Sequence, residues 1–157
     1  MTSSDSPSSS SATVQPSGLG GWLILMMIGQ VGGILRVLKS VVDDIALFKT
    51  PNLTSDGELV IYVELALNVG LFALVVVTTV MMFRKSRYFP SLWMCQGAAA
   101  VLLPFVDAVL IAGILKIEVS RLLDEQTIGQ TIGSAIAVGL WIWYLKVSVR
   151  VRNTFVN

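Results

Sequence analysis

Three ionisable side chains, Arg36, Glu64 and Asp107, lie inside stretches of sequence that are otherwise apolar enough to cross a membrane. Such groups are rare in hydrocarbon, because a charge at the bilayer centre costs roughly 2.5–3.5 kcal/mol on insertion scales. Two kinds of chemistry can retain them there. A guanidinium can pair with a carboxylate and hold helices together, or the carboxylates can face water and bind a proton, a cation or a small polar ligand.

Amide side chains extend this polar set. Helical spacing puts Asn68 one turn from Glu64, and Gln130 begins the polar stripe of the last apolar stretch. With a rise of ~1.5 Å per residue, counted from the middle of each stretch, all of these groups fall in one half of the bilayer. We therefore predict one intramembrane polar cluster of Arg36, Glu64, Asn68, Asp107 and Gln130.

Asp107 is the most constrained member of this cluster. The long side chain of Arg36 can reach the interface, and Glu64 also lies close enough to it to be hydrated. The short side chain of Asp107 lies deepest and must be paired, protonated or facing water. An ion pair of Arg36 with Asp107 or Glu64 is the first interpretation. A water-filled site that opens to the outside is the alternative.

The elements that must position these residues are membrane-spanning helices. Of the 157 residues, 54% are hydrophobic and 13% are charged, whereas a soluble domain carries about a quarter charged residues. Four apolar stretches are long enough to cross roughly 30 Å of hydrocarbon. We predict an all-α, integral membrane four-helix bundle that forms a single domain over residues 18–157. Its spans cover about residues 19–41, 59–83, 91–115 and 127–147.

The first 17 residues differ from the rest in composition. They contain eight serines and few apolar residues, so residues 1–17 are predicted to be a disordered tail. Orientation follows from the lysines and arginines that flank the spans. The short segments after the second and fourth spans contain six basic residues and no acidic ones (Arg84, Lys85, Arg87, Lys146, Arg150 and Arg152). We therefore predict that both termini are cytoplasmic.

Two glycine pairs have the spacing that lets membrane helices approach closely, Gly29 with Gly33 and Gly129 with Gly133. We predict that they pack inside the bundle. The alternative is that one pair contacts a second copy of the chain or a protein partner.

Several classes of function lack their residues. The chain has no histidine and one cysteine, Cys95, and it contains no nucleophile elbow, phosphate loop or metal-spaced ligand set. A net charge of +1 does not provide the basic face that nucleic acid requires. We predict a protein without enzymatic activity, cofactor, metal or nucleic-acid partner, whose surroundings are the lipid bilayer.

Three segments resemble one family of membrane proteins. They are Gly20-Gly21-Trp22-Leu23, the turn Arg84-Lys85-Ser86-Arg87 that leads into Phe89-Pro90, and the run Trp141 to Val156 with its closing Thr-Phe-Val. Together they are similar to the proteins grouped as domain of unknown function 2569, over about residues 18–157. The resemblance implies four spans, a bacterial inner-membrane location and no established activity. It also implies that four residues dock on the cytoplasmic face or on a partner (Ser148, Arg150, Thr154 and Phe155). The alternative is that they cap the helix and anchor at the interface.

The leading functional prediction is a non-enzymatic structural or partner-binding membrane component whose polar cluster holds the helices together. The alternative is a small transporter, channel subunit or sensor with a proton- or cation-responsive site in the outer half of the bundle.

Overall fold

The computed structural model describes residues 18–156, and the predicted serine-rich tail lies outside the described residues. Within this range the chain is all-helical and has no strands. Its elements are α1 (Trp22–Leu47), α2 (Ser55–Phe83), α3 (Phe89–Leu115), the short 3-10 helix η1 (Val119–Arg121), α4 (Glu125–Val147) and α5 (Val149–Thr154).

Helices α1 to α4 are each long and apolar enough to cross a membrane. Their ends are defined by local hydrogen bonds. The Thr54 side chain accepts from the backbone N–H of Gly57 at 3.2 Å and starts α2, and Asp124 starts α4 in the same way. Large apolar side chains such as Leu35 and Ile136 remain exposed along the helices, as a lipid-facing surface requires. The chain is therefore a multi-pass membrane protein of four antiparallel spans.

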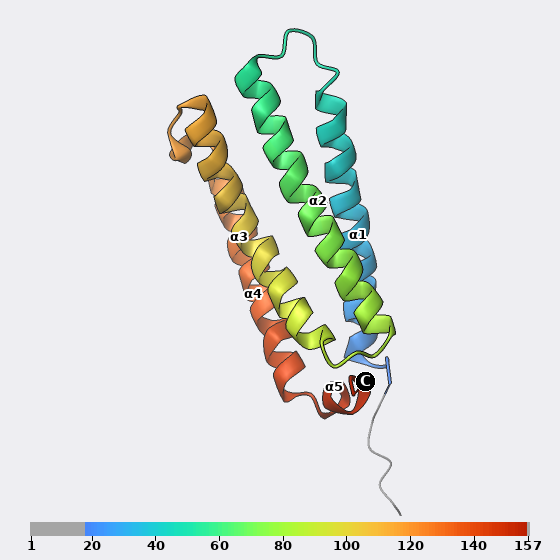
Figure 1. The fold of residues 1–157 in the computed structure, drawn as a ribbon. Coiled ribbons are helices and arrows are strands. Elements are labelled where there is room, and N and C mark those ends of the chain that lie inside the picture. Colours follow the sequence, from blue (N-terminus) through green and yellow to red (C-terminus); the bar gives the residue numbers. More distant parts are fainter. Residues whose placement is uncertain (1–17, 157) are drawn as a thin grey trace, which may run out of the picture.

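Consecutive helices pack in order, α1 against α2, α2 against α3, and α3 against α4 (Figure 1). The α2–α3 turn, α5 and the start of the described chain lie together at one end, which we call the base. The α1–α2 and α3–α4 connections lie at the other end, which we call the open end. Helix α4 packs on α3 and has few close backbone contacts with α1 or α2.

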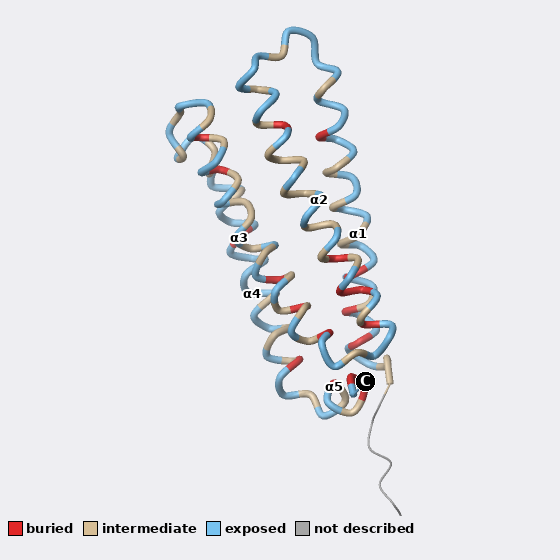
Figure 2. The backbone as a smooth tube through the Cα atoms, in the orientation of Figure 1, coloured by how far each residue is buried: buried red, intermediate tan, exposed pale blue. Residues whose placement is uncertain are grey.

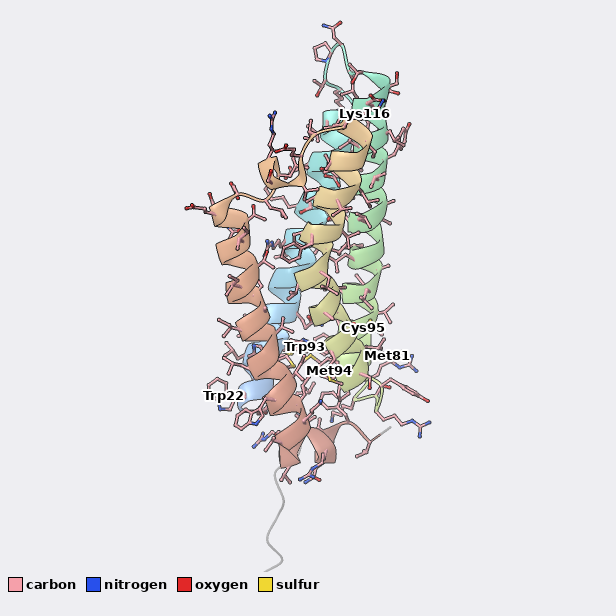
Figure 3. All side chains as sticks on the ribbon, turned by 90° about the vertical axis from the view of Figure 1, so that its left-hand side faces the viewer. Trp22, Met81, Trp93, Met94, Cys95 and Lys116 are labelled. Carbon is pink, nitrogen blue, oxygen red and sulfur yellow. The ribbon has the colours of Figure 1, made fainter. Side chains whose placement is uncertain are left out.

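The base holds the tightest packing in the molecule. Its buried cluster consists of Leu23, Met26, Met82, Phe89, Trp93, Leu145, Val151 and Phe155. Buried positions are frequent toward this end and sparse toward the open end (Figure 2). Seen from the side, the Trp22, Met81 and Trp93 side chains also lie near the base (Figure 3). The ring of Trp22 meets that of Trp141 edge-on with centroids 6.4 Å apart, so α1 reaches α4 at this end.

The predicted packing inside the bundle is wrong for Gly29, Gly129 and Gly133, whereas Gly33 is half-buried and lines the cleft described below. A Cβ placed on Gly29, Gly129 or Gly133 would meet nothing within 4 Å, and one on Gly33 would just touch Val75 at 4.0 Å. The close crossing lies elsewhere, because a Cβ on Gly97 of α3 would be 2.8 Å from Cγ1 of Val138 on α4.

The first helix also extends beyond the predicted first span, which ended at residue 41. Helix α1 continues to Leu47 because no glycine or proline interrupts the sequence before Pro51. An ion pair between Lys39 and Asp43, one turn apart, supports these added turns. The extension carries Asp44 into the bundle.

Candidate functional site

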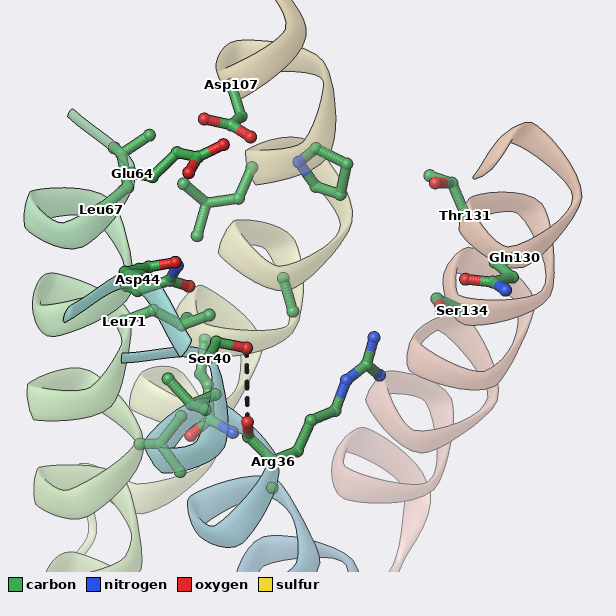
Figure 4. A pocket seen from close by; sticks show the side chains of 18 of the residues that line it. Arg36, Ser40, Asp44, Glu64, Leu67, Leu71, Asp107, Gln130, Thr131 and Ser134 are labelled. Atoms are coloured by element: carbon green, nitrogen blue, oxygen red, sulfur yellow. Dashed lines mark hydrogen bonds between the residues drawn. The ribbon is translucent and has the colours of Figure 1, made fainter. Parts of the chain in front are cut away.

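A cleft of about 560 Å³ lies between the helices on the open-end side of the base cluster (Figure 4). Its walls come from all four spanning helices. The polar side chains among its lining residues are Arg36, Ser40, Asp43, Asp44, Glu64, Asn68, Gln96, Asp107, Thr127, Gln130, Thr131 and Ser134. A volume of this size is within the usual range for small-molecule sites.

The structure brings all five residues of the predicted polar cluster to this cleft. Arg36 comes from α1, Glu64 and Asn68 from α2, Asp107 from α3 and Gln130 from α4. Glu64, Asn68 and Asp107 are half-buried, whereas Arg36 and Gln130 are exposed. The depth of each residue in the bilayer, estimated separately for each helix, therefore indicated which side chains line the same cleft.

Asp44 is a member of the site that the sequence analysis missed. Its side chain is 7% exposed and accepts a hydrogen bond of 2.8 Å from Nδ2 of Asn68. A buried carboxylate needs such donors, because desolvation without a partner is costly. Asp44 lies beyond the predicted end of the first span at residue 41, and it reaches the cleft because helix α1 continues to Leu47.

The predicted ion pair of Arg36 with Asp107 or Glu64 is not formed. Across residues 18–156, the ion pair of the structure is that between Lys39 and Asp43. The guanidinium group of Arg36 instead extends toward α4, on the side of Gln130 and Ser134 (Figure 4). The charged groups of the cleft are thus held apart.

Three of the four carboxyl groups that line the cleft, those of Asp44, Glu64 and Asp107, form no ion pair in the described part of the chain. The Glu64 and Asp107 side chains point into the same part of the cleft (Figure 4). Oδ1 of Asp107 is fully buried and has no hydrogen-bond partner among the described residues. Buried carboxylate oxygens normally accept a hydrogen bond, so this oxygen is available to a donor that enters the cleft.

The cleft ends toward the base at a pair of amides. Nε2 of Gln96 donates to Oε1 of Gln30 at 2.8 Å, and Nε2 of Gln30 donates in return to Oε1 of Gln96 at 3.2 Å. Gln30 is 4% exposed and was also missed. Leu23, Gln30, Val37 and Asp44 follow one another at seven-residue spacing along α1. Leu23, Gln30 and Asp44 are buried, and Val37 lines the cleft. This repeat is the signal in the sequence that could have identified Gln30 and Asp44.

The four residues singled out near the carboxy terminus lie at the base. The Ser148 side chain accepts from the backbone N–H of Val151 at 3.4 Å and so begins α5. Oγ1 of Thr154 accepts from the Gly18 N–H at 2.8 Å and donates to the Arg150 carbonyl at 2.7 Å.

An aromatic contact also holds α5 against the rest of the base. Phe155 stacks on Phe89 with ring centroids 4.5 Å apart. The Arg150 guanidinium lies beside Gly20, where a Cβ would be 2.5 Å from its Nη1. Helix α5 therefore closes the base.

The three segments that resemble the family lie at the start of α1, in the α2–α3 turn and at the end of α4 with α5. All three therefore meet at the base. A family model described as "Protein of unknown function (DUF2569)" matches residues 16–156 of the chain. The chain belongs to the DUF2569 family. No curated protein and no solved structure matches it. In this DUF2569 protein the shared segments build the base, whereas the polar cleft lies beyond them, between the spans.

Proposed function

We propose that this DUF2569 protein is a non-enzymatic membrane protein that binds a small, positively charged polar ligand in the cleft. One observation carries the proposal: the carboxyl groups of Asp44, Glu64 and Asp107 line the cleft without an ion-pair partner among residues 18–156, and Oδ1 of Asp107 is buried and unsatisfied there. A cation that donates hydrogen bonds would relieve the repulsion and satisfy this oxygen. This function belongs to the sensor or transporter class. We prefer it to the structural role that was predicted first, because that role depended on an ion pair of Arg36.

The arrangement of the carboxyl groups favours an organic ammonium group over a bare metal ion. Among residues 18–156, no three histidine, cysteine, aspartate or glutamate side chains converge closely enough to hold a metal. Calcium and magnesium require oxygen ligands at about 2.0–2.6 Å. Carboxyl groups spread over α1, α2 and α3 instead suit a ligand with several hydrogen-bond donors.

We propose further that both termini face the cytoplasm of a bacterial cell, so the cleft opens to the non-cytoplasmic side of the inner membrane. The base supports this orientation, because its described segments carry five exposed basic side chains and no acidic ones (Arg84, Lys85, Arg87, Lys146 and Arg152), whereas the basic side chains toward the open end stand among acidic ones.

Ethanolamine, a small primary ammonium, tests the proposed function. Binding is measured by calorimetry and by thermal unfolding of the purified protein in nanodiscs. We expect saturable binding to the wild type that weakens strongly in Glu64→Gln and Asp107→Asn. Glu58→Gln removes the same charge from the exposed first turn of α2 and should bind as the wild type does. Absent binding, or equal loss in all three variants, would refute the proposal.

The surface of α4 supports a second candidate, the binding of a protein partner. Gly129 and Gly133 are exposed, and nothing lies within 4 Å of a Cβ on either. We propose that a second copy or another membrane protein packs there. Cross-linking in membranes should show an assembly that Gly133→Ile abolishes and Gly113→Ile, on an equally open glycine of α3, retains. A monomeric wild type would exclude the second copy.

A further inference from the structure

The cleft carries charges of opposite sign on separate sides. Asp44, Glu64 and Asp107 come from the neighbouring helices α1, α2 and α3, while the Arg36 side chain extends toward α4 (Figure 4). Around Arg36, the α4 side of the cleft presents the neutral polar groups of Gln130 and Ser134. The cleft therefore has an acidic side and a basic side.

The basic side is as incomplete as the acidic one. A guanidinium group stays charged in proteins and presents a fork of donors that fits a carboxylate or phosphate with two parallel hydrogen bonds. In the described part of the chain, Arg36 forms no ion pair. It lies within a membrane-spanning helix, where an unpaired cation is unfavourable. An anionic group bound beside it would supply the missing partner.

A simple ion satisfies one side of this cleft and opposes the other. An ammonium ion without an acidic group would pair with the carboxyl groups and leave Arg36 unpaired. An anion without an ammonium group would pair with Arg36 and face three carboxyl groups. A ligand that carries both charges at its two ends matches both sides.

We propose, resting on the proposed function, that the ligand is a zwitterion with a primary ammonium and a phosphate or carboxylate group. Its ammonium group binds among Asp44, Glu64 and Asp107 and donates to Oδ1 of Asp107. Its anionic group binds the guanidinium of Arg36 on the α4 side.

Two sources can provide this chemistry. One is a small water-soluble zwitterion that enters from the open end. The other is the headgroup of an ethanolamine phospholipid, which would enter from the bilayer between α1 and α4, two helices that have few close backbone contacts with each other. The shared chemistry is the same, an ammonium and an anionic group joined by a short linker.

The test compares glycerophosphoethanolamine, which carries both charges, with ethanolamine, which carries only the ammonium. Both are titrated into the full-length protein in phosphatidylglycerol nanodiscs. We expect the wild type to bind glycerophosphoethanolamine about ten-fold tighter, because Arg36 adds a bidentate, charge-assisted contact. Arg36→Gln should remove this preference and leave ethanolamine binding at least as tight as in the wild type. Arg36→Lys, which keeps the charge without the fork, should retain part of it.

The controls separate this inference from the proposed function. Arg121→Gln removes a positive charge from exposed η1 and should keep the preference. Binding of both probes with equal affinity, or an Arg36→Gln variant that weakens both alike while keeping its helical circular dichroism, would refute the zwitterion and leave the proposed function standing. Binding of neither probe would refute both. In phosphatidylethanolamine nanodiscs, suppressed binding of the soluble probe identifies the lipid headgroup as the source, and unchanged binding identifies a free solute.

Discussion

Gln30 and Gln96 exchange two side-chain hydrogen bonds between α1 and α3, with Nε2···Oε1 distances of 2.8 and 3.2 Å. The paired amides satisfy each other at the boundary between the apolar base and the polar cleft. They join two helices that are not neighbours in the chain. The pair therefore ties the face of α1 that carries Gln30 to α3.

Replacement of one amide should destabilise the bundle more than replacement of both. Gln96→Leu leaves Gln30 buried and unsatisfied, which costs about 1–3 kcal/mol, and Gln30→Leu costs less because Gln96 is half-buried and lines the cleft. The double variant leaves no unsatisfied amide and should recover most of that loss. The measurement is the free energy of unfolding in detergent micelles. A double variant as unstable as the sum of the two single variants would show that the amides do not depend on each other.

Gly97 should tolerate a side chain far less than the predicted packing glycines. Its Cβ would lie 2.8 Å from Val138 Cγ1, so Gly97→Ala should push α4 away from α3 and cost about 1–3 kcal/mol. Gly29→Ala meets nothing within 4 Å and should leave stability unchanged or slightly higher, since alanine favours helix. Thermal unfolding compares the two. Recovery of Gly97→Ala by Val138→Ala would locate the clash, and equal effects of Gly97→Ala and Gly29→Ala would contradict this packing.

The same two glycines show what the sequence could and could not predict. Hydropathy and length predicted four spans, because both are properties of one segment at a time. Depth along each span likewise brought Arg36, Glu64 and Asp107 to one cleft, since it needs only a count of residues. Which face of a helix meets its neighbour depends on the rotation of both helices. For that reason the glycine spacing was misleading at Gly29, and the single Gly97 marks the real crossing.

The sequence also could not predict which side chains of the cleft would pair with one another. Arg36 had two carboxylates within reach by depth, yet it pairs with neither in the structure. Asp44 fell outside the first span, which was predicted to end at about residue 41. Only the three-dimensional position of Asn68, which donates to Asp44, explains how the carboxylate can remain buried.

Loss of the Phe155 ring should open the base. Phe155 is 6% exposed and stacks on Phe89, so Phe155→Ala removes a buried aromatic contact and leaves a cavity among the ends of α1, α3 and α4. Such truncations cost about 3–5 kcal/mol in well-packed cores. Val156→Ala, at the neighbouring residue with 66% exposure, is the matched control and should change little. The midpoint of thermal unfolding tests both, and equal midpoints would mean that α5 does not hold the base closed.

The start of α4 should lose stability in acid through Asp124. Hydrogen bonds from Thr127 hold the pKa of this exposed carboxyl below its ordinary value of 3.8, because they favour the charged form. A lowered folded-state pKa stabilises the helix start fully above 3.8, and this contribution disappears as the pH falls through the folded-state value. Hydrogen exchange of the Thr127 amide should therefore show less protection at about pH 2 than at pH 6, after correction for intrinsic rates. Asp124→Asn still caps the helix but does not titrate, so its protection should stay constant over this range. A wild type whose protection is equally constant would contradict the role of the carboxylate.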